Sequence, residues 1–216
     1  MATHATAGIT RRQRAQRLRG IYVILNDGPQ TLELARAVVD AGVAILQYRA
    51  KHGVVAARVR ALRELTRRSG ALLVMNDDWR AAAEFDCDGV HLGPEDDGFE
   101  NVASVRAALP EAVIGLSCGS LDEVRAAADA GVDYLGVGCV FATSSKHDAG
   151  EPIGIGRLGE LVRASSLPVA AVGGISATTL PDVVRSGAAM AAVISSVSSA
   201  LDPRRAAAEL VDAWNR

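Results

Sequence analysis

Aromatic residues are scarce in this chain: they make up 4% of its 216 residues. A buried core must therefore be built from Ala, Val, Leu and Ile. The three cysteines, Cys87, Cys118 and Cys139, lie far apart and show neither metal-ligand nor redox spacing, which favours buried thiols in a reducing cytosol. No apolar run has the length of a membrane span, and the N-terminus has no apolar signal core. We therefore expect a cytoplasmic protein that does not contact membranes.

An excess of positive charge is also missing, because the formal net charge is -2. This balance argues against a nucleic-acid partner bound through phosphate neutralisation, although it permits a local basic pocket. The one basic run, "RRQRAQRLRG", follows a small and polar N-terminus. We predict that residues 1–18 form a flexible basic arm in solvent and that residues 19–216 form one domain.

Short β-branched apolar runs alternate with helical patterns along the rest of the chain. The predicted strands are "IYVIL" (21–25), "AILQYR" (44–49), "ALLVMN" (71–76), "GVHL" (89–92), "AVIGLS" (112–117), "YLGVG" (134–138), "PVAAVG" (168–173) and "MAAVIS" (190–195). Helices are predicted near 30–42, 54–69, 78–85, 100–109, 120–131, 156–165, 176–187 and 203–215. The alternation predicts an α/β protein with a parallel sheet.

The junctions between helix and strand repeat one pattern. "DAGVAIL", "DCDGVHL" and "DAGVDYL" each end a helix with Gly and begin a strand at once, which indicates one supersecondary unit used repeatedly. An open doubly wound sheet is the alternative, but it usually has fewer strands, and no glycine-rich dinucleotide turn follows the first strand. The prediction is therefore a single (β/α)8 TIM barrel.

Polar residues gather where the second predicted strand ends. Gln47, Arg49 and Lys51 alternate along "QYRAK", and a period of two places all three on one side, toward the barrel mouth. Two neighbouring cations repel each other unless an anion joins them. The arrangement indicates an anion site, with a salt bridge at the rim as the simpler alternative.

Carboxylates follow the third and fourth strands. Asp77 in "NDD" and Asp96 in "GPEDD" are hard oxygen ligands, which suit Mg²⁺ together with phosphate. Helix capping is the competing explanation, and it suits the neighbours Asp78 and Asp97. His91, within the apolar "GVHLG", is expected to be a hydrogen-bonded structural residue and not a metal ligand.

The last three strand ends carry small residues. "VGGIS" and "VISS" expose backbone N–H groups beside helix N-termini, the usual phosphate site of this fold. Thr143, Ser145 and Lys146 follow the sixth strand and supply small hydroxyls and one flexible cation. A polar surface loop would also explain them, but together with the other strand ends they indicate a site for two phosphorylated groups.

Taken in order, "LQYRAK", "MND", "GVHLGPED", "GLSCGS", "DYLGVGCVFATSSKHD", "PIG", "VGGIS" and "VISS" resemble the thiamine phosphate synthase family, from about Arg19 to the end. The resemblance implies Mg²⁺-dependent coupling of 4-amino-2-methyl-5-pyrimidinylmethyl diphosphate to a thiazole phosphate. It assigns Asp77 and Asp96 to the metal, and Arg49, Lys51, Ser117 and Lys146 to catalysis and to binding of the pyrimidine substrate. The other implied substrate-binding residues are Gln47, Asn76, Thr143, Ser145, Gly174, Ile194 and Ser195.

The sequence departs from the family pattern at Pro94, where Gln is common, at Asp78, where Arg is common, and at Gly119-Ser120, where His-Thr is frequent. Two other hypotheses stay open. One is a thiazole tautomerase, in which a histidine at the place of Gly119 takes part in proton transfer. The other is a non-catalytic thiamine-phosphate binder. The thiazole form and the oligomeric state, including a homodimer, also stay open.

Overall fold

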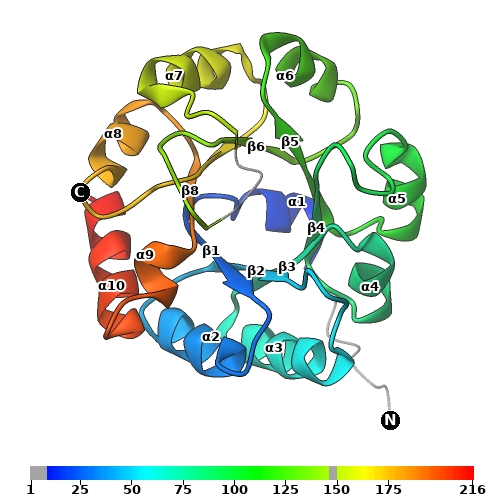
Figure 1. The fold of residues 1–216 in the computed structure, drawn as a ribbon. Coiled ribbons are helices and arrows are strands. Elements are labelled where there is room, and N and C mark those ends of the chain that lie inside the picture. The colour runs from blue at the N-terminus through cyan, green and yellow to red at the C-terminus, as the bar shows by residue number, and fades with distance from the viewer. Residues whose placement is uncertain (1–8, 146–149) are drawn as a thin grey trace.

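The computed structural model describes residues 9–145 and 150–216. Eight parallel strands close into a barrel in sequence order, and Figure 1 shows the ring of helices around them. The predicted (β/α)8 architecture is therefore confirmed. The strands are β1 (Gly20–Asn26), β2 (Ile45–Arg49), β3 (Leu72–Asn76), β4 (Gly89–Leu92), β5 (Val113–Cys118), β6 (Tyr134–Gly138), β7 (Val169–Val172) and β8 (Met190–Val193).

The helices follow the predicted alternation, with two additions. They are α1 (Arg11–Ala15), α2 (Thr31–Asp40), α3 (Ala56–Ser69), α4 (Trp79–Glu84), α5 (Val102–Ala108), α6 (Leu121–Ala127), α7 (Gly154–Ala164), α8 (Leu180–Arg185), α9 (Ser195–Ser198) and α10 (Pro203–Trp214). The sequence pattern did not predict α1 or α9. Among the residues that the structure describes, no helix combines the length and apolarity needed to cross a bilayer.

The alternation of side chains along each strand divides the core into two layers. One face of each strand packs against the helices, and the other face fills the barrel interior. The interior cluster is mainly aliphatic but contains two tyrosines: its buried members are Leu18, Tyr22, Ile24, Ile45, Leu72, Val74, Val113, Tyr134, Ala170, Met190 and Ala192. All three cysteines are buried free thiols, as expected from their spacing.

Helix α1 lies at the end of the barrel where the strands begin. Its Arg14 is 7% exposed, and its Nε donates to Asp88 Oδ1 at 2.9 Å, just before β4. Arg11 Nε donates likewise to Asp133 Oδ1, just before β6, at 2.7 Å. Two acidic groups beneath the barrel therefore hold the helix, although it belongs to the predicted arm of residues 1–18. The domain boundary at residue 18 stays a prediction.

Asp88 connects helix α1 to the sheet, and its removal should destabilise the fold. It is 3% exposed and also accepts from Arg63 Nη1 at 2.8 Å and from the Leu73 backbone N–H at 3.0 Å. Asp88→Ala removes a buried carboxylate that pairs with two buried arginines, so we expect a loss of about 3–5 kcal/mol in the free energy of unfolding.

Urea unfolding measures this loss as a lower midpoint at an unchanged slope. The control is Asp182→Ala, which removes an ion pair with Arg185 on an exposed helix face and should cost about 0.5 kcal/mol or less. Equal losses in the two variants would contradict the structural importance of the ion pairs around Asp88.

Candidate active site

The end of β2 carries the first predicted site residues. Gln47 is 3% exposed and reaches into the barrel, where its Nε2 donates to Tyr22 Oη at 2.7 Å. Arg49 is the last residue of the strand, and its Nη1 donates to Asn26 Oδ1 at 3.2 Å. Lys51 lies in the exposed turn that follows. The predicted alternation therefore does not extend to Lys51, because the chain leaves the strand before it.

Asp77 and Asp96 come together at the barrel mouth, as the sequence predicted. Partial burial, a hydrogen bond with Asp96 and the negative charge of Asp96 raise the pKa of Asp77 to about 7. The positive charge of Arg49 and a hydrogen bond with Asn76 lower the same pKa, which places both residues beside the acid pair. A cation between the two carboxylates would relieve their repulsion.

Local backbone structure holds each carboxylate in place. Asp77 has φ 65°, in the left-handed region that non-glycine residues seldom adopt, and its N–H donates to the His91 carbonyl at 2.9 Å. Asp96 Oδ2 accepts from the Gly93 N–H at 2.5 Å. Strain of this kind is found at functional sites, where the surrounding structure supports it.

The donor set fits Mg²⁺. Two carboxylates supply hard oxygen ligands, and the described part of the chain has no group of three or more His, Cys, Asp or Glu side chains that would form a closed metal cage. Mg²⁺ commonly binds through one or two carboxylates and takes its remaining ligands from water and phosphate.

The neighbouring acidic residues have other roles. Asp78 is the N-cap of α4 and accepts from the Ala81 N–H at 2.8 Å, so the capping interpretation is confirmed for it. It was wrong for Asp97, which pairs with Arg80 on the surface, while Asn101 caps the next helix, α5. The difference arises because the chain runs several residues further before α5 begins.

The loops after β6, β7 and β8 lie against one another. The Phe141 N–H donates to the Gly173 carbonyl at 3.1 Å, and Ser145 Oγ donates to Ser195 Oγ at 3.0 Å. Gly174 has φ 64°, and a Cβ there would lie 2.6 Å from the Ala142 carbonyl oxygen. Only glycine allows the loop after β6 to pack this closely.

This packing brings together most of the predicted phosphate-binding residues: Thr143, Ser145, Gly174, Ile194 and Ser195. Ile194 is the N-cap of α9, and Ser195 is its first residue, so β8 ends earlier than predicted. Thr143 Oγ1 accepts from the Ser145 N–H at 3.2 Å, which shapes the turn between them. Lys146, the remaining predicted residue of this loop, lies outside the described residues.

Ser117, near the end of β5, contacts a residue that the sequence analysis left out of the site. Its Oγ lies 3.1 Å from His91 Nε2, and His91 Nδ1 lies 3.1 Å from Tyr134 Oη. His91 is thus hydrogen-bonded, as expected, but it faces the barrel interior beside Ser117. The sequence offered one hint of polar contacts inside the barrel, because the two predicted strands that contain Tyr22 and Tyr134 are otherwise apolar.

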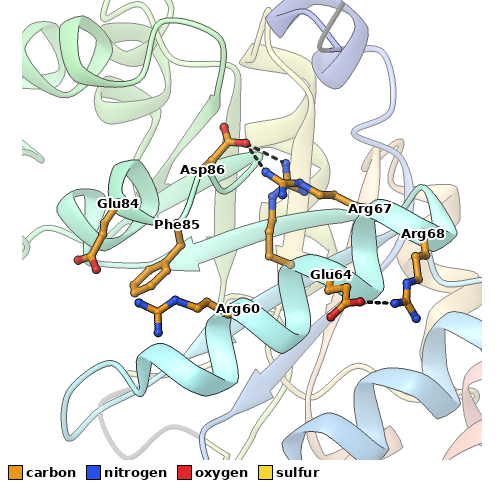
Figure 2. Close-up of a pocket in the computed structure, with 8 residues that line it drawn as sticks. Arg60, Glu64, Arg67, Arg68, Glu84, Phe85 and Asp86 are labelled. Atoms are coloured by element: carbon orange, nitrogen blue, oxygen red, sulfur yellow. Dashed lines mark hydrogen bonds and ion pairs between the residues drawn. The ribbon is translucent and has the colours of Figure 1, made fainter. Parts of the chain in front are cut away.

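A surface cavity of about 500 Å³ lies away from the mouth, between α3 and the end of α4 (Figure 2). Arg67 Nη2 pairs there with Asp86 at 2.6 Å, and Arg68 pairs with Glu64. The guanidinium of Arg60 lies over the Phe85 ring, 5.3 Å from its centroid. Because Asp86 lies three residues before β4 begins, this cavity is near the end of the barrel where the strands begin, whereas Asp77 and Asp96 lie at the opposite end.

Comparison with known proteins identifies the family. A family model described as thiamine monophosphate synthase matches residues 21–197. The chain belongs to this family.

A thiamine-phosphate synthase from Moorella thermoacetica is 38% identical over 203 residues, which cover 91% of this chain and 96% of that protein. A thiamine biosynthesis bifunctional protein, ThiM/ThiE, from Symbiobacterium thermophilum is 43% identical over 91% of this chain, which spans only 41% of that longer protein. The solved structure of thiamine phosphate pyrophosphorylase from Pyrococcus furiosus superimposes with a TM-score of 0.82 at 35% identity, covering 92% of this chain and 96% of that one.

Gly119 and Ser120, which depart from the pattern of the thiamine monophosphate synthase family, directly precede helix α6. Ser120 is its N-cap and forms a capping box with Glu123, while the Gly119 N–H donates to Glu123 Oε2 at 2.6 Å. The two residues therefore have a structural role at this helix terminus.

Proposed function

We propose that the chain joins 4-amino-2-methyl-5-pyrimidinylmethyl diphosphate to a thiazole phosphate and releases diphosphate, as a thiamine phosphate synthase. Family membership supports this proposal. The observation that carries it is the presence of two separate polar groups at the mouth. The acid pair with Arg49 follows β2 to β4, and the Ser145–Ser195 contact joins the loops after β6 and β8. In a closed barrel of this strand order, the groups face each other.

The β2–β4 side suits a diphosphate. Arg49 supplies positive charge next to Asp77 and Asp96, which would hold Mg²⁺. When bound, Mg²⁺ would neutralise charge on the diphosphate oxygens. We assign Gln47, Asn76, Lys51 and Ser117 to the pyrimidine diphosphate as well, together with Lys146.

The β6–β8 side suits a phosphate monoester. The hydroxyls of Thr143, Ser145 and Ser195 and the backbone N–H groups near Gly174 and Ile194 are donors that phosphate oxygens accept from. Small side chains leave space for the ligand. We assign this group to the thiazole phosphate.

The reaction follows from this arrangement. Cleavage of the bond between the methylene carbon and oxygen places negative charge on the departing diphosphate, and Arg49 stabilises that charge where it develops. The resulting cation is stabilised by the electron-rich aminopyrimidine. The phosphate-binding group on the β6–β8 side holds the thiazole nitrogen in line with the carbon that it attacks. No side-chain nucleophile is needed.

Incubation with both substrates and Mg²⁺ tests the proposal, with product detected by mass and diphosphate measured separately. Formation of thiamine phosphate with stoichiometric diphosphate is the expected result. Isomerisation of the thiazole without diphosphate release would indicate the tautomerase instead, and binding without turnover would indicate a binder. A homodimer and a cytoplasmic location stay predictions.

Gly174→Ala should weaken binding of the thiazole phosphate. A Cβ at this left-handed position clashes with the Ala142 carbonyl and displaces the loop that carries Thr143 and Ser145. We expect KM for the thiazole phosphate to rise about tenfold, with a smaller change for the pyrimidine diphosphate. The control is Gly156→Ala in α7, where a Cβ would meet open space. An unchanged KM in Gly174→Ala would contradict the role of this loop in binding the thiazole phosphate.

A further inference from the structure

Five polar side chains form one continuous row of hydrogen bonds across the barrel interior. The row begins at β2, where Gln47 Nε2 donates to Tyr22 Oη, and continues to Tyr134 Oη at 3.1 Å. From Tyr134 it passes to His91 Nδ1, and from His91 Nε2 to Ser117 Oγ, each step 3.1 Å. It therefore joins two residues assigned to the pyrimidine diphosphate through three residues that have no assigned role.

The barrel is built to contain this row. Tyr22 and Tyr134 are 2% and 0% exposed. Burial raises the pKa of both tyrosines well above the usual value, so both keep their hydroxyl hydrogens. A Cβ on Gly115 would lie 2.2 Å from the Tyr134 ring, and one on Gly136 would lie 2.8 Å from the His91 ring. These two glycines leave the space that the rings occupy.

Each hydroxyl in the row has a single hydrogen, so the direction of one hydrogen bond constrains the next. Either tyrosine can be the donor in the Tyr22–Tyr134 contact, so the row has two directions open to it. In one of them Tyr22, which accepts from the Gln47 amide, gives its own hydrogen to Tyr134. Tyr134 in turn donates to His91 Nδ1, which requires the neutral histidine to carry its hydrogen on Nε2. His91 then donates to Ser117 Oγ.

We propose that the row runs in this direction, from Gln47 to Ser117, and is a positioning chain that fixes Ser117 as a hydrogen-bond donor toward the bound substrate. Ser117 accepts from His91, so its own hydrogen is directed to an acceptor atom of the ligand. Tyr22, Tyr134 and His91 are positioning residues that act through Ser117. The identity of the ligand, the pyrimidine diphosphate, rests on the proposed function, whereas the direction of the chain does not.

The histidine tautomer tests the direction of the chain without any substrate. In protein labelled with ¹⁵N-histidine, the NMR signals of the two ring nitrogens distinguish the tautomers, and His91→Gln assigns His91 among the four histidines of the sequence. We expect the Nε2–H tautomer in the wild type and a shift toward mixed or Nδ1–H signals in Tyr134→Phe. An Nδ1–H tautomer in the wild type, or no change in Tyr134→Phe, would overturn the proposal.

Tyr48→Phe is the matched control, because Tyr48 is the third tyrosine of the chain and is also 0% exposed. Tyr48 points to the other face of β2, and its hydroxyl donates to Asp27, outside the row. This variant loses a hydroxyl of the same kind but should leave the His91 signals unchanged. Circular dichroism establishes that each variant is folded. Tyr22→Phe is the second variant, and it should shift the signals less, because Tyr134 still faces His91.

Kinetics test whether the chain acts through Ser117. Tyr134→Phe should lower kcat about tenfold or more, as losses of supporting hydrogen bonds at active sites do, with little change in KM for the thiazole phosphate. In a Ser117→Ala background the same substitution should change kcat less than twofold. Equal effects in both backgrounds, or an equal loss in Tyr48→Phe, would overturn the positioning role. If the wild type formed no thiamine phosphate, the proposed function would fail while the NMR result still decided the direction of the chain.

Discussion

Asp77→Ala and Asp96→Ala should each lower Mg²⁺-dependent turnover by about 10²–10³-fold and raise the Mg²⁺ concentration required. The two carboxylates lie together at the ends of adjacent strands, and either one alone offers a weaker site for a divalent cation. Thiamine phosphate formation across a Mg²⁺ titration is the measurement. The fold should survive, because both carboxylates lie at the barrel mouth and neither belongs to the buried core.

The control for both variants is Asp97→Ala, which removes a neighbouring carboxylate that pairs with Arg80 on the surface. It should keep the Mg²⁺ dependence of the wild type. If Asp77→Ala and Asp96→Ala kept it too, the metal assignment would be wrong.

Thermal unfolding gives a readout of the same pair that does not require activity. Asp96→Asn removes the charge that raises the pKa of Asp77 but keeps an oxygen for the Gly93 N–H. In the presence of a chelator, we expect a higher melting temperature than that of the wild type, because the repulsion is gone. Added Mg²⁺ should stabilise the wild type more than the variant. A lower melting temperature in the chelated variant would mean that the two carboxylates do not repel each other.

Arg49→Ala should lower the single-turnover rate with both substrates saturating, by about 10²-fold. The guanidinium lies beside the acid pair, where charge develops on the departing diphosphate, so it stabilises the transition state more than the ground state. Lys51→Ala should have a smaller effect, because Lys51 lies in an exposed turn beyond the strand.

Arg60→Ala, on the outer surface of α3, controls for the loss of one positive charge from the protein. It should leave the single-turnover rate unchanged. A change confined to thiazole phosphate affinity in Arg49→Ala would mean that the two phosphate sites are assigned the wrong way round.

The fold followed from local patterns. Short apolar runs alternate with helical patterns along the chain, Gly recurs at several junctions from helix to strand, and a parallel closed barrel satisfies these patterns at once. Asp77 and Asp96 could be paired from the sequence for the same reason, because residues that follow adjacent parallel strands meet at one end. Asp78 was identified as a cap because capping depends on residues only three positions apart.

Other features depended on contacts between distant segments. The basic run near the N-terminus was expected to lie in solvent, yet Arg14 is buried against Asp88, 74 positions away. Composition indicates charge but not the partner that neutralises it. Lys51 left the predicted alternation because strand length is set by pairing with the neighbouring strands and not by its own sequence alone.

The row from Gln47 to Ser117 is the clearest case. Its residues come from β1, β2, β4, β5 and β6, and each is an ordinary polar residue in an apolar strand when considered alone. The alternating pattern determined that each side chain faces the barrel interior. Only closure of the barrel brought their atoms within hydrogen-bonding distance, because that distance depends on how far each strand is shifted relative to its neighbours.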